Sequence, residues 1–205
     1  MSGRPNVTLF YRYSWVSTAC LVLAVLSGAL VGLWERARLL PSYIFFFSFA
    51  SFSVMFFQGI LTRGAEGLDR LDLAEQRGLL AATLLVSALC VVSELGLLPW
   101  LKIPAGLLLG LAVAHHGLQI WRGRRLAEIW RHIAWRFFFT DMLFLLVAAV
   151  GLAALGWKQT WPDFPLIPDF LRPAIVFLGA SFPLTLTFTG YLYLLAQQNG
   201  GLSKG

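Results

Sequence analysis

The sequence predicts an all-α integral membrane protein, a bundle of six transmembrane helices. Hydrophobic residues make up 58% of the chain and charged residues only 13%, whereas soluble domains are roughly one quarter charged. The apolar residues also cluster in runs of the length that a helix needs to cross a bilayer, about 20 residues. A water-soluble chain of 205 residues could not bury this much apolar surface. We therefore expect residues 1–205 to form a single membrane domain.

Six apolar stretches meet the length requirement, and we predict spans at residues 14–34, 42–62, 78–98, 104–121, 137–157 and 173–197. Tryptophans mark many of their ends, as expected at a membrane interface: Trp15, Trp34, Trp100, Trp121, Trp157 and Trp161. The first run has no clear small-residue cleavage site, so we interpret it as a retained helix.

The distribution of basic residues predicts the orientation. With the N-terminus inside, the inner segments hold eleven Lys or Arg residues and the outer segments hold five. Inner loops carry the excess of basic residues, so both termini are predicted in the cytoplasm. Arginine outnumbers lysine 13 to 3, which favours a bacterial inner membrane. Because the basic residues lie between apolar runs, the net charge of +6 is explained by orientation and does not indicate a nucleic-acid partner.

Two connections have a distinctive pattern. Between spans 4 and 5 an apolar arc opposes a polar arc, which predicts a cytoplasmic amphipathic helix at the interface. The apolar arc is Leu126, Ile129, Trp130, Ile133, Ala134 and Phe137, and the polar arc is Glu128, Arg131, His132 and Arg136. Residues 157–172 contain three prolines and several aromatics, which predicts an ordered outer loop or a lid.

Small residues predict close helix packing in lipid. They recur in span 1 (Cys20, Ala24, Gly28, Gly32) and in span 4 (Gly106, Gly110, Ala114, Gly117). Span 2 has a small and polar face (Ser48, Ser51, Met55, Gln58, Thr62) that should point into the bundle. Its opposite face carries phenylalanines (Phe45, Phe46, Phe49, Phe52, Phe56, Phe57) that should meet lipid, a flat hydrophobic ligand or another protein.

Polar residues inside spans are candidates for a polar cavity or a proton relay, because they are costly in hydrocarbon. We single out Glu94 in span 3, Asp141 in span 5 and Gln58 in span 2. Asp141 could instead pair locally with Arg136, and Glu94 could be solvated at the outer end of its span. In span 6, Pro183 predicts a kink beside a hydroxyl stripe formed by Ser181, Thr185 and Thr189.

The histidines suggest a cofactor site. A hairpin turning at 122–125 would place His115 or His116 at a depth similar to that of His132, the arrangement that bis-histidine ligation of haem b requires. In the alternative interpretation, His132 lies on the solvent-facing side of the interfacial helix, and the protein binds no haem. The sequence contains no Cys/His ligand cluster that would predict a structural metal site.

Three functions fit these patterns. The first is a non-catalytic membrane subunit of a larger complex, such as a respiratory or energy-converting assembly, with the lipid bilayer and other membrane subunits as partners. The second is a small-solute transporter or substrate-binding membrane component. The third is a haem-b or metal-binding redox protein. The sequence has no catalytic motif of a known type, so it favours a protein that is not an enzyme.

Overall fold

The structure is a computed structural model, and it describes residues 5–31, 39–61, 73–122, 133–162 and 182–198. These residues form an all-helical protein with no strand among them. Five helices are long and apolar enough to cross a membrane, at Arg12–Ala29, Leu40–Gly59, Ala74–Glu94, Pro99–Trp121 and Ile133–Thr160. A shorter apolar helix covers Pro183–Ala196. The all-α prediction is therefore confirmed for the described residues, and the five long apolar helices are consistent with a multi-span membrane protein. The predicted sixth span is represented only by the shorter helix.

In chain order the elements are α1 (Pro5–Val31), α2 (Leu40–Tyr43), the π-helix η2 (Ile44–Ala50), α3 (Ser51–Leu61), α4 (Leu73–Glu94), the 3₁₀-helix η4 (Pro99–Leu101), α5 (Lys102–Trp121), α7 (Ile133–Thr160) and α9 (Phe182–Gln198). The predicted interfacial helix falls mostly on residues 123–132, which lie outside the described residues. Its last positions belong to α7, which already begins at Ile133. The predicted loop or lid also falls almost wholly outside them, since α7 continues to Thr160.

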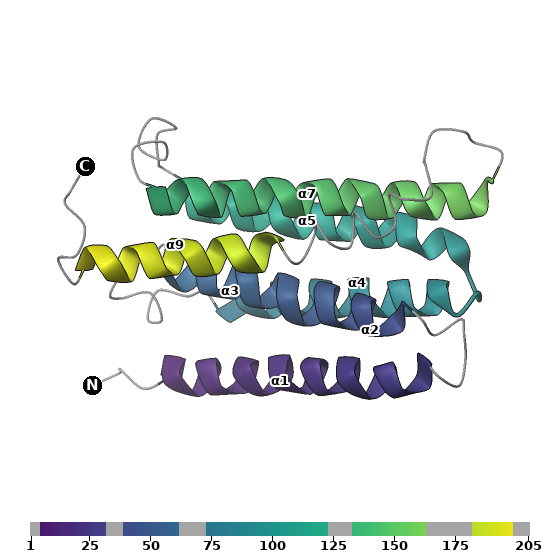
Figure 1. Ribbon diagram of the computed structural model, residues 1–205, viewed down its shortest axis with the longest axis horizontal. Coiled ribbons are helices and arrows are strands. Elements are labelled where there is room, and N and C mark those ends of the chain that lie inside the picture. Colours follow the sequence, from purple (N-terminus) through teal and green to yellow (C-terminus); the bar gives the residue numbers. More distant parts are fainter. Residues whose placement is uncertain (1–4, 32–38, 62–72, 123–132, 163–181, 199–205) are drawn as a thin grey trace.

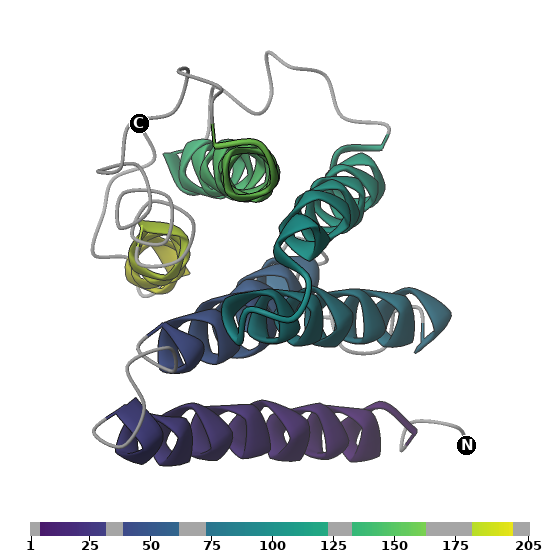
Figure 2. The same ribbon diagram turned by 90° about the vertical axis from the view of Figure 1, so that its right-hand side faces the viewer.

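Helices α7 and α9 run along the long axis of the molecule and are seen end-on in Figure 2, whereas α1 lies oblique to them and forms a separate layer (Figures 1 and 2). Helix α1 forms an outer layer against α2 and η2, and the continuous segment α2–η2–α3 packs beside α4. Helices α5 and α7 form the closest pair on the other side, and α9 packs on both α7 and α3. Four exposed arginines, Arg12, Arg77, Arg122 and Arg136, lie toward the end where α1 begins and α9 ends, which we call the arginine end.

Small residues hold α5 against α7. A Cβ atom added at Gly106 would lie 2.6 Å from the backbone nitrogen of Ala153, and one added at Gly156 would lie 2.7 Å from that of Ile103. Only glycine lets the two backbones approach this closely, which is how helices associate in lipid. The stripe predicted in span 4 is thus the α7-facing side of α5 at Gly106, Gly110 and Gly117, whereas Ala114 is exposed. In α1, Cys20 and Ala24 are buried but Gly28 is open.

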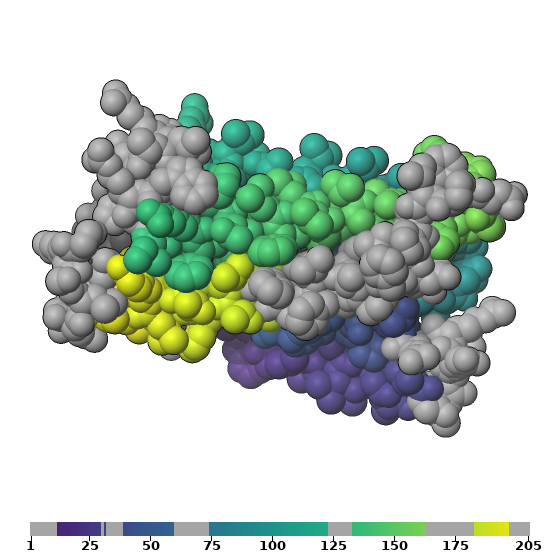
Figure 3. Space-filling model, turned by 45° about the horizontal axis from the view of Figure 1, so that its top comes forward, coloured from purple at the N-terminus to yellow at the C-terminus, as the bar shows by residue number. Residues whose placement is uncertain are grey.

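The apolar core of the described bundle also holds buried polar side chains, and many large apolar side chains are exposed. The interior of the described bundle contains ionisable and amide side chains, among them Gln58, Gln76, Lys102, His116 and Asp141. Apolar side chains of α5 and α7 point outward instead, including Leu107, Leu111, Leu118 and Val150. Figure 3 shows one face of the surface that these helices form. Polar groups inside and apolar groups outside are the arrangement expected in lipid.

The phenylalanine face of the second span is divided. Phe52 and Phe56 are buried against Tyr13 of α1, with ring centroids 5.5 Å apart in both pairs. Phe57 is exposed. The expectation that this face meets lipid or an external partner is therefore wrong for Phe52 and Phe56, because a helix of the same chain covers them. The predicted polar face is buried at Ser48, Ser51, Met55 and Gln58.

Candidate functional site

Three helices contribute one side chain each to a buried polar cluster. Gln58 of α3, Asp141 of α7 and Thr187 of α9 are 0%, 0% and 7% exposed, respectively. The Gln58 amide nitrogen Nε2 donates to Asp141 Oδ2 and to Thr187 Oγ1, both at 3.0 Å. The Thr187 hydroxyl also donates to Asp141 Oδ2. We call these three residues the Asp141 triad.

Close packing fixes the position of the triad. On the same face of α7, Phe138 lies three residues before Asp141 and is buried. A Cβ atom at Gly190 of α9 would lie 2.9 Å from the Phe138 ring, so only glycine allows α9 to lie this near α7. Thr187 precedes Gly190 by three residues and so occupies the same face of α9. The glycine thereby brings the Thr187 hydroxyl to the Asp141 carboxyl group.

The triad leaves two acceptors open. Both hydrogen bonds to Asp141 reach Oδ2, while Asp141 Oδ1 and Gln58 Oε1 are buried and have no hydrogen-bond partner among the described residues. A buried polar atom without a partner costs about 1–3 kcal/mol. Both open atoms are oxygens and belong to side chains already in contact. The site therefore suits one additional donor, such as a proton, a water molecule or an N–H group of a ligand.

A cavity reaches the triad from the side of the bundle. It has a volume of about 620 Å³ and lies between α1, α3 and α9, with Thr187 in its wall. Its other lining side chains are aromatic or aliphatic apart from the hydroxyls of Ser14, Ser17, Thr18, Ser53 and the two tyrosines. We call this cavity the lateral groove. Thr187 is the residue common to the groove and the triad, so Asp141 lies one hydrogen bond behind the groove wall.

A second buried pair lies nearer the arginine end. His116 of α5 is fully buried, and its Nδ1 atom lies 3.6 Å from Glu75 Oε1 of α4. Gln76, the next residue of α4, is also fully buried, and its amide has no hydrogen-bond partner among the described residues. His115 points away from the pair and is exposed. The pair joins α4 to α5.

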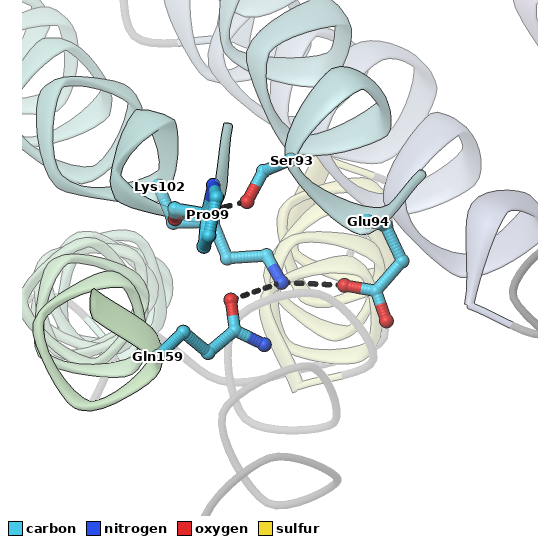
Figure 4. Close-up of polar contacts among 5 residues, drawn as sticks. All are labelled: Ser93, Glu94, Pro99, Lys102 and Gln159. Carbon is cyan, nitrogen blue, oxygen red and sulfur yellow. Dashed lines mark hydrogen bonds and ion pairs between the residues drawn. The ribbon is translucent and has the colours of Figure 1, made fainter. Parts of the chain in front are cut away.

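The third polar cluster lies at the opposite end of the bundle (Figure 4). Lys102, the first residue of α5, is 0% exposed and forms an ion pair with Glu94, the last residue of α4. Its Nζ atom also donates to Gln159 Oε1 of α7 at 2.8 Å and lies 5.2 Å from the centre of the Tyr43 ring. Ser93 donates to the carbonyl oxygen of Pro99 at 3.0 Å, which fixes the turn between α4 and α5. One ammonium group thus joins α2, α4, α5 and α7.

The structure brings together only some of the residues that the sequence singles out. Asp141 and Gln58 both belong to the triad, whose three members come from different helices. Arg136, which the sequence suggested as an alternative partner of Asp141, is exposed. Glu94 is largely buried in an ion pair. Thr185 and Thr189 are exposed, and Thr189 donates to the Thr185 carbonyl oxygen. Ser181 and His132 lie outside the described residues, so the paired-histidine haem site stays a prediction.

Sequence reasoning missed Thr187, Lys102, Gln159 and Glu75. Thr187 is offset by two residues from the predicted hydroxyl stripe, and the buried Gly190 three residues later was the available signal for the inward face. Lys102 was interpreted as part of an outer connection, although it lies eight residues after Glu94, close enough for a hairpin to join them. Glu75 lies in a charged segment that reads as a connection, yet α4 already begins at Leu73.

Pro183 is the second residue of α9, within its first turn, where proline fits a helix. The part of the predicted kinked span before Phe182 lies outside the described residues.

Within the described part of the chain, no group of three or more His, Cys, Asp or Glu side chains could hold a metal ion. Comparison with family models, curated proteins and solved structures finds no match to this chain.

Proposed function

We propose that this protein is a six-span membrane carrier that binds a small solute next to the Asp141 triad and couples its movement to protonation of Asp141. The observation that carries the proposal is a fully buried carboxyl group with one oxygen unpartnered among the described residues, one hydrogen bond behind a lateral groove. Ionisable side chains inside membrane helices mark substrate paths and proton relays. A structural role alone would be served by a carboxyl group with both oxygens satisfied.

The proposed topology has α9 as part of the sixth span and both termini in the cytoplasm. The described α9 has 17 residues and a length of about 26 Å, slightly short of a bilayer core of about 30 Å. Helix α1 begins at the arginine end of the bundle, and α9 ends there. This supports a cytoplasmic location for both termini. The scarcity of lysine supports a bacterial inner membrane.

The other two functions have less support. A subunit of a larger complex would need a surface suited to a partner, but lipid accounts equally well for the exposed Leu and Val side chains of α5 and α7. A haem b would use His115 or His116. Of these, His115 is exposed, His116 has its Nδ1 atom 3.6 Å from Glu75 Oε1, and the other predicted ligand His132 lies outside the described residues, so no pair of ligands supports a haem. The triad and the groove favour transport of a small solute.

Carbodiimide labelling tests whether Asp141 can carry a proton inside the membrane. Dicyclohexylcarbodiimide partitions into lipid and reacts with protonated carboxyl groups. We expect mass spectrometry of the treated protein to find the adduct on Asp141 and none on Glu94, whose carboxylate is paired with Lys102. The matched control is Asp141→Asn, which should lose the adduct. Absence of an adduct on Asp141 in the wild-type protein would contradict the proposal.

Transport is tested in proteoliposomes that contain a pH-sensitive dye. Members of a panel of small amines, alcohols and carboxylic acids are added outside, and the internal pH is recorded. We expect one solute class to change the internal pH in wild-type vesicles beyond its effect on protein-free vesicles, and Asp141→Asn to abolish this change. Equal responses of the wild type, the variant and protein-free vesicles would argue against a carrier.

A further inference from the structure

We infer that the lateral groove binds an organic ammonium ion, one with an apolar body and at least one N–H group. This inference rests on the proposed function, because it names the solute class for the same carboxyl group. It is carried by the side chains that line the groove and by the two oxygens behind its wall.

The groove has the size and lining of a ligand site. Its volume of about 620 Å³ lies within the range of about 300–1,000 Å³ found for small-molecule sites. Six aromatic side chains from α1, η2, α3 and α9 line it: Tyr13, Phe49, Phe56, Phe57, Phe188 and Tyr191. The faces of such rings attract cations as well as apolar groups. No charged side chain among the described residues lines the groove itself.

The charge of the nearest buried ionisable group favours a cation. When Asp141 is ionised, its negative charge lies one hydrogen bond behind the groove, next to Thr187. That charge attracts an ammonium ion more strongly in this low-dielectric interior than it would in water. Arg77 of α4 acts electrostatically on Tyr13 at the groove edge, and the Tyr13 hydroxyl has no hydrogen-bond partner among the described residues. Arg77 is exposed, so solvent and headgroups screen its charge, whereas Asp141 is fully buried. Lys102 lies at the opposite end of the bundle and is paired.

The hydrogen-bonding pattern selects among cations. Asp141 Oδ1 and Gln58 Oε1 are both acceptors, and neither has a donor among the described residues. Neither residue lines the groove, so a primary or secondary ammonium reaches these oxygens only past the Thr187 side chain. A quaternary ammonium has no N–H to donate to either oxygen and leaves them unsatisfied. The same pattern disfavours a carboxylic acid anion, whose charge would oppose that of Asp141.

The position of the groove gives such a solute a route from the membrane. The groove is lined by residues of α1, η2, α3 and α9 and by none of α4, α5 or α7, so it lies on one side of the described bundle. Figures 1 and 2 show where these helices lie. Amphiphilic amines concentrate at membrane interfaces with the ammonium group near the headgroups. A solute entering sideways would place its apolar body between the aromatic rings and its ammonium group toward Thr187.

Binding of three matched probes tests the inference. Tritiated phenylbutylammonium, its N,N,N-trimethyl derivative and phenylbutanol share one apolar body and differ in charge and donors. Binding is measured on the full chain in lipid nanodiscs, with empty nanodiscs as the blank for partition into lipid. We expect phenylbutylammonium to bind about tenfold or more tightly than either analogue, because only it supplies both charge and donors. It should also protect Asp141 from carbodiimide.

Two variants and a matched control complete the test. Asp141→Asn should lose most of the specific binding, and Thr187→Val should weaken it. Thr189→Val alters an exposed threonine of the same helix that does not line the groove, so it should bind like the wild type. Equal binding of the ammonium and the alcohol, or undiminished binding by Asp141→Asn, would overturn the inference. If carbodiimide still labels Asp141 and another solute class still moves protons, the proposed function stands and only the solute class is wrong.

Discussion

Gln58 and Asp141 are 83 residues apart in the chain, yet the Gln58 amide donates to the Asp141 carboxyl group at 3.0 Å inside the bundle. Thr187, a further 46 residues along, donates to the same oxygen. These contacts therefore depend on the packing of three separate helices. It gives the protein a buried acid held in one orientation, with one of its oxygens open among the described residues.

The triad should contribute to stability as well as to function. Asp141→Ala removes the acceptor of two buried donors and should lower the free energy of unfolding by about 1–3 kcal/mol. Asp141→Asn keeps an oxygen for both donors and should change stability much less. Thermal unfolding in detergent, followed by tryptophan fluorescence, would measure both changes. An equal loss in the two variants would show that the hydrogen bonds to Oδ2 do not stabilise the fold.

The buried ion pair between Lys102 and Glu94 should respond to single and double substitution differently. Lys102→Met leaves a largely buried carboxylate without its ammonium, and such broken pairs cost about 3–5 kcal/mol. Lys102→Met combined with Glu94→Gln removes both charges and should recover much of the loss. Lys158→Met alters a less buried lysine of α7 and serves as the control. Failure of the double variant to recover stability would indicate that Lys102 acts mainly through Gln159 and Tyr43.

Glycines of α5 and α1 should differ in their tolerance of alanine. Gly106→Ala would place a methyl group 2.6 Å from the Ala153 backbone, so α5 and α7 must separate and the melting temperature should fall. Gly28→Ala meets nothing within 4 Å and should be neutral or stabilising, by up to about 1 kcal/mol from helix propensity. The two melting temperatures, measured in the same detergent, provide the comparison. A lower melting temperature for Gly28→Ala than for Gly106→Ala would contradict the packing described here.

The two neighbouring histidines should behave differently. His116→Leu removes a buried neighbour of the Glu75 carboxylate and should destabilise the protein, and Glu75→Gln in the same chain should recover part of the loss because the side chain facing the new leucine is then uncharged. His115→Leu changes an exposed side chain and should have little effect. Unfolding of the variants would measure these differences. An absorption spectrum of each purified variant would at the same time test the predicted haem, since a Soret band lost on replacing a histidine identifies a ligand.

Reporter fusions test the proposed topology. Green fluorescent protein joined after Gly205 should fluoresce, and alkaline phosphatase joined there should be inactive, because both results indicate a cytoplasmic C-terminus. Fusion of the phosphatase after residue 162, beyond the end of α7, should be active. Active phosphatase after Gly205 would contradict the six-span arrangement with both termini inside.

The sequence alone determined the class of this protein and the identity of several polar residues that matter. Hydropathy depends on neighbours in the chain, so the apolar runs predict the five long helices to within a few residues at most ends. The same local logic identified Asp141, Gln58 and Glu94, because a polar side chain in an apolar run is visible without a structure. Boundaries were less accurate where charged residues continue a helix, as at Glu75 and at the start of α7.

Only the tertiary structure decided which polar groups meet. Hydropathy does not report the rotation of one helix against another, so the exposed Thr185 and Thr189 could not be distinguished from the buried Thr187. The π-helix at Ile44–Ala50 changes that rotation within the second span, since seven residues follow a wider turn. Lys102 appeared to belong to a loop. Its burial depends on contacts with Glu94, Gln159 and Tyr43, which lie in three other elements and are not visible in the sequence. Contacts between distant segments set these pairings, and close approach at glycine made them possible.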